Sequence, residues 1–325
     1  MAASSQSRTV IYAALIGNLL VAVTKAVAAA ISGSSAMLSE AVHSFVDTGN
    51  EVLLLYGMHR AAEHADPEHP LGHGRELYFW SFIVALLIFA LGAGISIYEG
   101  VNHIRHPEPI TDPLVNYVVL ALALLFEGTT WIIALRRFRA VKGSLGYYAA
   151  FRRSKDPPSF MVLFEDSAAL AGIFLAAAGT FATVTLKAPV FDGIASILIG
   201  LVLGAVAILL ARESKSLLIG ERAGRGLSEA ILRIAEAEPS VERVNGVLTV
   251  QLAPDQIVAA LSIEFTDDVR VSELERRVTE IEHKVRAAHP EVVALFLKPQ
   301  TNSRYREMVR RRLGGAASEA GTVQE

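Results

Sequence analysis

Long apolar runs alternate with short polar segments from residue 10 to residue 211. Each run has about 20 residues or slightly more, which is enough for a helix to cross a bilayer. The pattern predicts a bundle of six transmembrane helices after an N-terminal tail (1–9), with the first helix uncleaved rather than a signal peptide. The predicted spans are Val10–Ile31, Ala36–Met58, Leu77–Tyr98, Pro113–Leu135, Phe160–Leu186 and Val190–Ala211.

After Ala211 the pattern changes to that of a soluble domain. It predicts a small two-layer α+β domain over residues 212–300, with one sheet face covered by helices. A tail (301–325) follows, first basic and then disordered. The predicted elements are a helix capped by Ser228 that ends near Ala237, strands Val244–Leu252 and Ile257–Phe265, a helix with Ser272 and Glu275 at capping-box spacing that ends near Ala288, and strand Glu291–Leu297.

Composition agrees with a membrane protein. Of the 325 residues, 52% are hydrophobic, and the mean hydropathy is +0.40. The net charge of −3 gives no basic surplus that would indicate a nucleic-acid partner. Cysteine is absent, so any transition metal would be held by His, Asp, Glu or backbone oxygen.

Basic residues gather in alternate connections between the runs, which predicts that both termini are cytoplasmic. The opposite connections carry only Arg105 and Lys187. The basic set comprises Arg8, Arg60, Arg75, Arg136, Arg137, Arg139, Lys142, Arg152, Arg153, Lys155, Arg212 and Lys215.

The second run carries a polar stripe at helical spacing. Glu40, His43, Asp47 and either Asn50 or Glu51 share one face of the expected helix. A charged carboxylate near mid-membrane costs roughly 2.5–3.5 kcal/mol on insertion scales, so such stripes face a partner, a water path or an ion. His43 and Asp47, four residues apart, could hold one metal ion from a single helix. Helix-packing hydrogen bonds are the alternative.

The fifth run offers a second set of ligands. Glu165 and Asp166 are adjacent, point about 100° apart, and cannot both share fully in one site. We expect Asp166 to meet the His43/Asp47 pair, with Glu165 in reserve. The alternative is that both lie in water at the helix entrance.

The loop Glu63–Glu76 is rich in candidate ligands. His69, His73 and Asp66 cluster there between prolines and glycines, which favour a shaped loop over a helix. A metal-capturing loop and a solvated polar turn are both consistent with this pattern.

Three further ionisable residues lie within the apolar runs, and the first run also carries Asn18. Lys25 either extends to the interface or pairs with a carboxylate such as Glu40. Asp192, after Pro189, is expected to cap a helix. Glu127 has no ionisable partner at helical spacing and receives no role.

These motifs resemble the cation diffusion facilitator family. The stretch S-S-A-M-L-S-E-A-V-H-S-F-V-D-T-G-N at Ser34–Asn50 is similar to that family's second-helix signature, and G-H-G-R-E-L-Y-F-W-S-F at Gly72–Phe82 to its second loop. The resemblance spans roughly Val10–Pro299. It implies a ferredoxin-like C-terminal domain and a homodimeric exporter, not an enzyme, that exchanges cytoplasmic zinc or a related divalent ion for protons. It needs no cofactor besides the transported metal.

The resemblance also implies residue roles. His43, Asp47 and Asp166 match the transport site, with Glu165, Asn50 or water in the fourth place, and His69 and His73 match the loop site. The usual fifth-helix His is replaced by Val162, which favours harder ions such as Mn²⁺ or Fe²⁺ as competitors to Zn²⁺. Phe296-Leu297-Lys298 stands where metal-sensing members carry His and Asp.

The expected location is a bacterial inner membrane, with divalent metal, protons and the lipid bilayer as partners. Two other functions remain open at this stage. One is a transport-impaired dimeric modulator with the same fold, suggested by Val162. The other is a membrane-embedded metallohydrolase, for which no catalytic motif such as H-E-x-x-H is present.

Overall fold

A computed structural model describes residues 3–313, with side chains for residues 15–140 and 142–311. The chain divides into two compact units. The first holds Met1–Glu63 and Arg75–Ser216, and the second holds His64–Gly74 and the chain from Leu217 onward. Each unit is described by itself.

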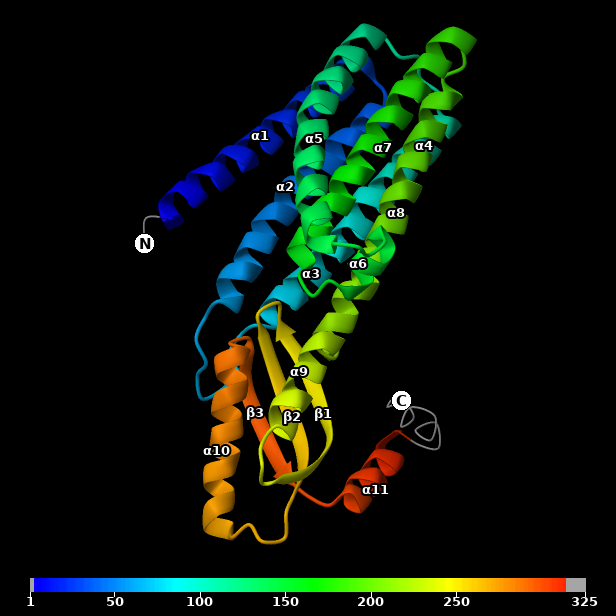
Figure 1. The fold of residues 1–325 in the computed structure, drawn as a ribbon. Coiled ribbons are helices and arrows are strands. Elements are labelled where there is room, and N and C mark those ends of the chain that lie inside the picture. Colours follow the sequence, from blue (N-terminus) through cyan, green and yellow to red (C-terminus); the bar gives the residue numbers. More distant parts are fainter. Residues whose placement is uncertain (1–2, 314–325) are drawn as a thin grey trace. The chain divides into compact units, whose positions relative to one another are not determined.

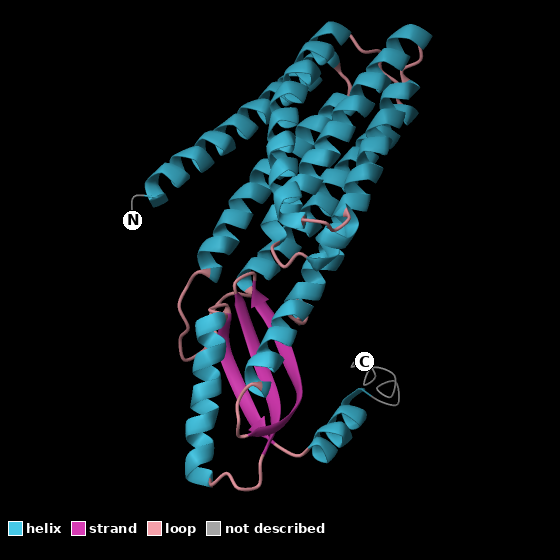
Figure 2. Ribbon diagram, viewed as in Figure 1, coloured by secondary structure: helices cyan, strands magenta, loops and turns pink. Residues whose placement is uncertain are grey.

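The first unit is a helical bundle (Figures 1 and 2). The helices α3, η1 and α4 follow one another without a break, and η1 is a π-helical turn in the middle of this long helix. Six long helices therefore occupy the predicted places. The elements are α1 Ala3–Ser32, α2 Ser35–Ala61, α3 Glu76–Leu87, η1 Ile88–Ala93, α4 Gly94–Arg105, α5 Pro113–Lys142, α6 Tyr147–Arg153, α7 Pro157–Leu186 and α8 Val190–Ile219.

Five of these helices are long and apolar enough to cross a membrane, judged by length and composition. The corresponding spans are Leu15–Ser32, Glu76–Arg105, Pro113–Ala140, Pro157–Leu186 and Val190–Ile219. Helix α2 is not among them because it carries Glu40, His43, Asp47, Asn50 and Glu51. The fold class expected from the sequence is confirmed, with α2 as the polar member of the bundle.

The start of α2 is fixed by two side chains. Ser34 is its N-cap, and the Ser34 hydroxyl accepts a hydrogen bond from the Met37 N–H at 3.1 Å. Asp192, in the first turn of α8, accepts from the Ser35 N–H at 2.5 Å and from the Ala36 N–H at 3.3 Å. Asp192 was expected to act as a cap, and the helix that it caps is α2.

Helix α2 packs against α1, α3, α4 and α7, so its polar face is enclosed by neighbours. Small residues allow close approach elsewhere in the bundle. A Cβ at Gly100 of α4 would overlap the backbone of Gly193 on α8, and a Cβ at Gly179 of α7 would overlap Ala195. Close backbone contact substitutes here for the hydrophobic drive that lipid does not provide.

The second unit has the predicted helix–strand–strand–helix–strand order. Strand β2 lies between β1, with which it pairs antiparallel, and β3, with which it pairs parallel. The elements are α9 Arg225–Glu236, β1 Val241–Ala253, β2 Gln256–Phe265, α10 Val271–Ala288, β3 Val292–Pro299 and α11 Asn302–Leu313.

Both predicted helix caps in this unit are wrong. Helix α9 begins at Arg225 after Gly224, so Ser228 lies inside the helix rather than at its cap. Helix α10 begins at Val271, with Arg270 at the N-cap position, so Ser272 is a helical residue. The chain enters α9 three residues before Ser228 and α10 one residue before Ser272.

The core of the second unit lies between the sheet and helices α9 and α10. Ile231 of α9, Leu261 of β2, and Ile281 and Val285 of α10 are all fully buried there. Part of the segment predicted to be a tail (301–325) has regular structure, because Asn302–Leu313 forms helix α11. Residues 314–325, where disorder was expected, lie outside the described residues. At the other end, α1 begins at Ala3, so Ala3–Thr9 is helical.

Candidate functional site

A cavity of about 720 Å³ opens inside the first unit, between α1, α2, α5, α6 and α7. Six carboxylates line it: Asp47 and Glu51 from α2, Glu127 from α5, Asp156 just before α7, and Glu165 and Asp166 from α7. The two helices expected to share the site, α2 and α7, therefore meet at this cavity, and α5 joins them.

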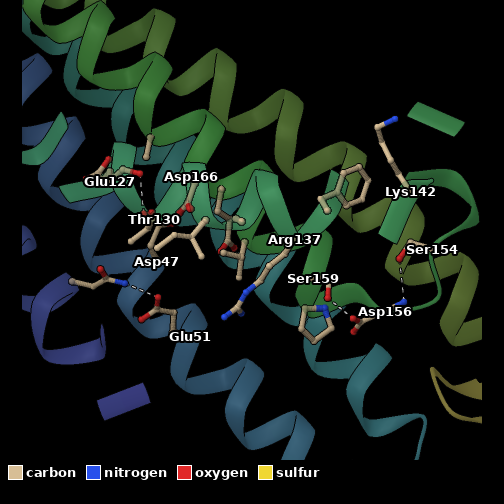
Figure 3. Close-up of a pocket in the computed structure, with 18 of the residues that line it drawn as sticks. Asp47, Glu51, Glu127, Thr130, Arg137, Lys142, Ser154, Asp156, Ser159 and Asp166 are labelled. Atoms are coloured by element: carbon tan, nitrogen blue, oxygen red, sulfur yellow. Dashed lines mark hydrogen bonds between the residues drawn. The ribbon is translucent and has the colours of Figure 1, made fainter. Parts of the chain in front are cut away.

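Three of the carboxylates lie together at one end of the cavity, and Asp156 lies at the other end (Figure 3). Asp47, Asp166 and Glu127 gather there beside Thr130, whereas Lys142, Ser154 and Ser159 lie at the other end. The side chain of Arg137 on α5 extends into the space between the two ends. The cavity thus has an acidic end and an opposite end where Lys142 and two serine hydroxyls lie with the carboxylate of Asp156.

The predicted i, i+4 pair is present on α2. His43 Nδ1 lies 3.3 Å from Asp47 Oδ1, with His43 buried and Asp47 half-buried. Asp47 lines the cavity, whereas His43 lies outside its lining. The negative charges of Asp47, Glu51 and Glu127 all act on Asp166 of α7.

The sequence left open whether Asn50 or Glu51 lies on the polar stripe of α2, and the structure gives each residue a different contact. The Asn50 amide is buried and donates to Glu165 Oε1 at 3.2 Å, so it holds a carboxylate of α7. Glu51 lines the cavity and accepts a hydrogen bond from Asn18 of α1 at 2.5 Å. Of the two residues, it is Glu51 that reaches the cavity, which the polar stripe alone could not decide.

Lys25 does not extend to the interface. Its ammonium group is fully buried and pairs with Glu40 Oε2 at 2.9 Å and with Glu127 Oε1 at 2.7 Å. Glu127, which received no role from the sequence, is therefore the partner of a lysine on another helix. No spacing rule within one helix could have identified this pair.

Several polar atoms around the cavity are buried without a hydrogen-bond partner among the described residues. They are both ring nitrogens of His43, Asp47 Oδ1, Glu127 Oε2 and Asp166 Oδ2. Buried acceptors of this kind are costly unless a donor or a cation satisfies them. Imidazole nitrogen and carboxylate oxygen are the ligands that a borderline divalent cation prefers.

Asp47 of α2 and Asp166 of α7 line one cavity, but the expected ligand atoms of His43, Asp47 and Asp166 do not converge on one point. In the part of the chain that the structure describes, a group of three candidate ligands within 4.8 Å of one another occurs only at Asp66, His69 and His73. These are the loop residues singled out from the sequence.

The loop cluster is built around Asp66. Its carboxylate accepts from the backbone N–H groups of His69 at 2.6 Å and Glu68 at 2.8 Å, and Oδ2 lies 3.0 Å from His73 Nε2. The His69 and His73 rings lie 4.3 Å apart between their centroids. Chiefly because of the backbone hydrogen bond from His69, the pKa of Asp66 is lowered to about 2.

The loop is held in place within the second unit. A Cβ at Gly74 would overlap Ala253 and Gln256, the residues that flank the β1–β2 turn. Gly72 has a φ of +79°, a conformation that glycine adopts without strain. Glycine at both positions therefore allows the loop to turn tightly against the sheet domain.

A helical bundle of membrane-spanning length with an acidic cavity in its interior, joined to a small α+β domain, defines a class of polytopic ion-handling membrane proteins. Residues 11–219 match the family model of the cation efflux transmembrane domain. The chain belongs to this family, the cation diffusion facilitators, as the motifs in the second helix and second loop indicated.

The chain is similar to several named proteins. It is 33% identical over 237 residues to the proton-coupled zinc antiporter SLC30A9 of human mitochondria, which covers 72% of this chain and 42% of the relative. It is 30% identical over 250 residues to metal tolerance protein C4 of Arabidopsis thaliana, covering 76% of this chain and 54% of the relative. It is 30% identical over 148 residues to the cation-efflux pump FieF of Cronobacter sakazakii, covering 44% and 48%. The chain spans about half the length of these relatives or less.

Proposed function

We propose that this protein exports a divalent metal cation, most readily zinc, in exchange for protons. The proposal rests on one observation above all. Carboxylate oxygens of Asp47, Glu127 and Asp166 that have no hydrogen-bond partner among the described residues lie at a cavity between α2, α5 and α7, with the buried His43 imidazole beside Asp47, in a chain of the cation efflux family. The names of the relatives, a proton-coupled zinc antiporter and a cation-efflux pump, agree with it.

In this proposal His43 and Asp47 of α2 and Asp166 of α7 bind the ion. Glu165, Asn50 or water completes the set, and Asn50 acts by holding Glu165. Zinc bound by such ligands has Zn–N and Zn–O distances of about 2.0–2.2 Å. Because the ligand atoms are not converged in this conformation, binding requires α2 and α7 to close on the ion. Rigid-body tilting of helices is one established way to achieve this.

Proton coupling follows from the chemistry of the ligands. A metal ion binds neutral imidazole and ionised carboxylates, so protons and metal compete for the same atoms. Where protons are abundant they displace the metal, and where they are scarce the metal displaces them. A proton gradient thereby drives metal in the opposite direction, without a separate proton carrier.

Val162 gives a reason to consider other metals. It lines the cavity one turn before Asp166 on α7, where a histidine would add a nitrogen ligand. Without that nitrogen the site is richer in oxygen, which suits Mn²⁺ or Fe²⁺ better. The same residue is the argument for a transport-impaired modulator with this fold.

The remaining assignments accompany the transport proposal. Asp66, His69 and His73 form a second metal site, supported by ligand atoms within 4.8 Å of one another. Both termini face the cytoplasm, supported by the distribution of Lys and Arg. The protein acts as a homodimer.

The test is metal flux in proteoliposomes with an imposed pH gradient. Purified wild-type protein, His43→Ala and Asp47→Ala are reconstituted side by side, with Zn²⁺, Mn²⁺ and Fe²⁺ supplied separately. We expect gradient-driven Zn²⁺ flux for the wild type and its loss in both variants, with His69→Ala as the comparison at the loop cluster.

Flux that persists in His43→Ala or Asp47→Ala would refute the site assignment. Absence of flux for all three metals in the wild type would favour the modulator. A preference for Mn²⁺ or Fe²⁺ would retain the mechanism and change the substrate.

A further inference from the structure

Lys25 sits at the centre of a buried ionic triad that joins three helices. Its three ammonium protons are all used, in hydrogen bonds to Glu40 Oε2 at 2.9 Å, Ser44 Oγ at 3.0 Å and Glu127 Oε1 at 2.7 Å. Lys25 and Glu40 are fully buried, and the Glu127 side chain is 13% exposed. Two carboxylates and a hydroxyl around one positive charge resemble the ligand set of a cation site, occupied here by the lysine itself.

Glu127 belongs to both the triad and the cavity. It lines the cavity with Asp47 and Asp166, and its charge acts on Asp166. One oxygen is bound to Lys25, whereas Oε2 is buried without a hydrogen-bond partner among the described residues. Figure 3 places Glu127 beside Asp166 at the acidic end.

Glu40, the other carboxylate of the triad, is more tightly enclosed than Glu127. Glu40 is fully buried and lies outside the cavity lining. A Cβ at Gly172 of α7 would overlap its Oε1. Glu40 therefore anchors Lys25 from outside the cavity lining, which leaves Glu127 as the member of the triad that an ion in the cavity can attract.

We propose that Lys25 is a tethered cation that controls Glu127, a further carboxylate of the transport cavity on α5, and so limits how tightly the cavity holds a divalent ion. In the metal-free protein Lys25 holds and neutralises Glu127. A divalent ion at the acidic end competes with Lys25 for this carboxylate, and Lys25 recaptures it as the ion leaves. Lys25 is a positioning residue, since it acts on the ion through Glu127.

This inference rests on the proposed function and adds two residues to it. It implies opposite effects for two changes in one triad. Removing the charge of Glu127 weakens ion binding, whereas freeing Glu127 from Lys25 strengthens it. A purely structural salt bridge would give loss or no change in both cases.

The test is Zn²⁺ binding to the full-length protein in detergent, measured by isothermal titration calorimetry with Zn²⁺ alone as the probe. Glu127→Gln keeps an acceptor for Lys25 and removes one charge, so we expect about tenfold weaker binding. The double variant Lys25→Met with Glu40→Gln keeps the single net negative charge of the triad but releases Glu127. For it we expect at least about threefold tighter binding and slower release of metal.

Two controls separate this inference from the proposed function. Lys187→Met removes an exposed lysine outside the cavity and should bind as the wild type does. Asp47→Ala should lose binding at the cavity. If Asp47→Ala binds as the wild type does, the proposed site itself is wrong.

If Asp47→Ala loses binding but the folded double variant binds Zn²⁺ no more tightly than the wild type, Lys25 is structural and the inference is overturned. Unchanged affinity in Glu127→Gln overturns it as well. Folding is checked by the thermal unfolding midpoint. If one of the two triad variants does not fold, the other decides the question alone.

Discussion

Replacing Gly172 with alanine tests the packing that holds Glu40 against Lys25. Gly172 is buried on α7, and a Cβ there would overlap the Glu40 carboxylate. A flexible glutamate could ordinarily move aside. Glu40 is fully buried and fixed by its 2.9 Å ion pair with Lys25, so moving it would disturb that pair.

The expected change in the free energy of unfolding is the cost of crowding Glu40 less the gain from placing alanine in a helix. Overpacking a buried site costs about 1–3 kcal/mol, and displacing one partner of a buried ion pair can cost about 3–5 kcal/mol. Alanine in place of glycine within a helix returns about 1 kcal/mol. After that gain, overpacking alone would cost about 0–2 kcal/mol and full displacement of Glu40 about 2–4 kcal/mol. For a partly displaced Glu40 we therefore expect Gly172→Ala to destabilise the protein by about 1–3 kcal/mol in all.

The assay is the thermal unfolding midpoint of the purified protein in detergent. Gly204→Ala on α8 is the matched control, because its new Cβ would make an ordinary contact with Ala93. We expect the control to be neutral or slightly stabilised and Gly172→Ala to unfold several degrees lower, at roughly 2–4 °C per kcal/mol. In a Glu40→Ala background, the added cost of Gly172→Ala should disappear.

Equal midpoints for Gly172→Ala and Gly204→Ala would refute the packing argument. The same would follow if the cost of Gly172→Ala were unchanged in the Glu40→Ala background, because the clash would then involve some other group.

Two further predictions concern the metal ligands. Val162→His should shift transport and binding toward Zn²⁺ over Mn²⁺ by about tenfold, because it adds a nitrogen ligand to the cavity; unchanged metal selectivity would argue that Val162 does not face the ion. Because the pKa of Asp66 falls from its usual 3.8 to about 2, its hydrogen bonds stabilise the loop above about pH 4 and are lost as the pH falls from there through 2. The amide resonance of His69, followed by NMR in detergent, should titrate near pH 2, and a midpoint near pH 4 would contradict the geometry of the loop.

Much of the architecture could be predicted because the hydrophobic period and the length of each segment are local properties of the sequence. Six long helices and a five-element α+β domain occur where the apolar runs and alternating stretches indicated them. The His43/Asp47 pair follows from the 3.6-residue repeat of one helix, and the shaped loop that carries Asp66, His69 and His73 from its prolines and glycines.

What could not be predicted depends on how helices face one another. Lys25 and Glu127 are distant in the sequence, and nothing in either helix indicates that the two side chains meet. Asn50 and Glu51 are adjacent on α2, so the polar stripe could not decide which of them reaches the cavity. The caps at Ser228 and Ser272 failed because helix starts depend on the tertiary entry of the chain as well as on the capping side chain.

The most direct test of the account is to locate bound zinc by anomalous scattering from crystals of the wild-type protein grown with Zn²⁺. We predict a zinc peak at the acidic end of the cavity, with carboxylate oxygens of both Asp47 and Asp166 within about 2.0–2.2 Å of the metal. Zinc bound only at Asp66, His69 and His73, with the cavity empty and those two carboxylates apart, would contradict it.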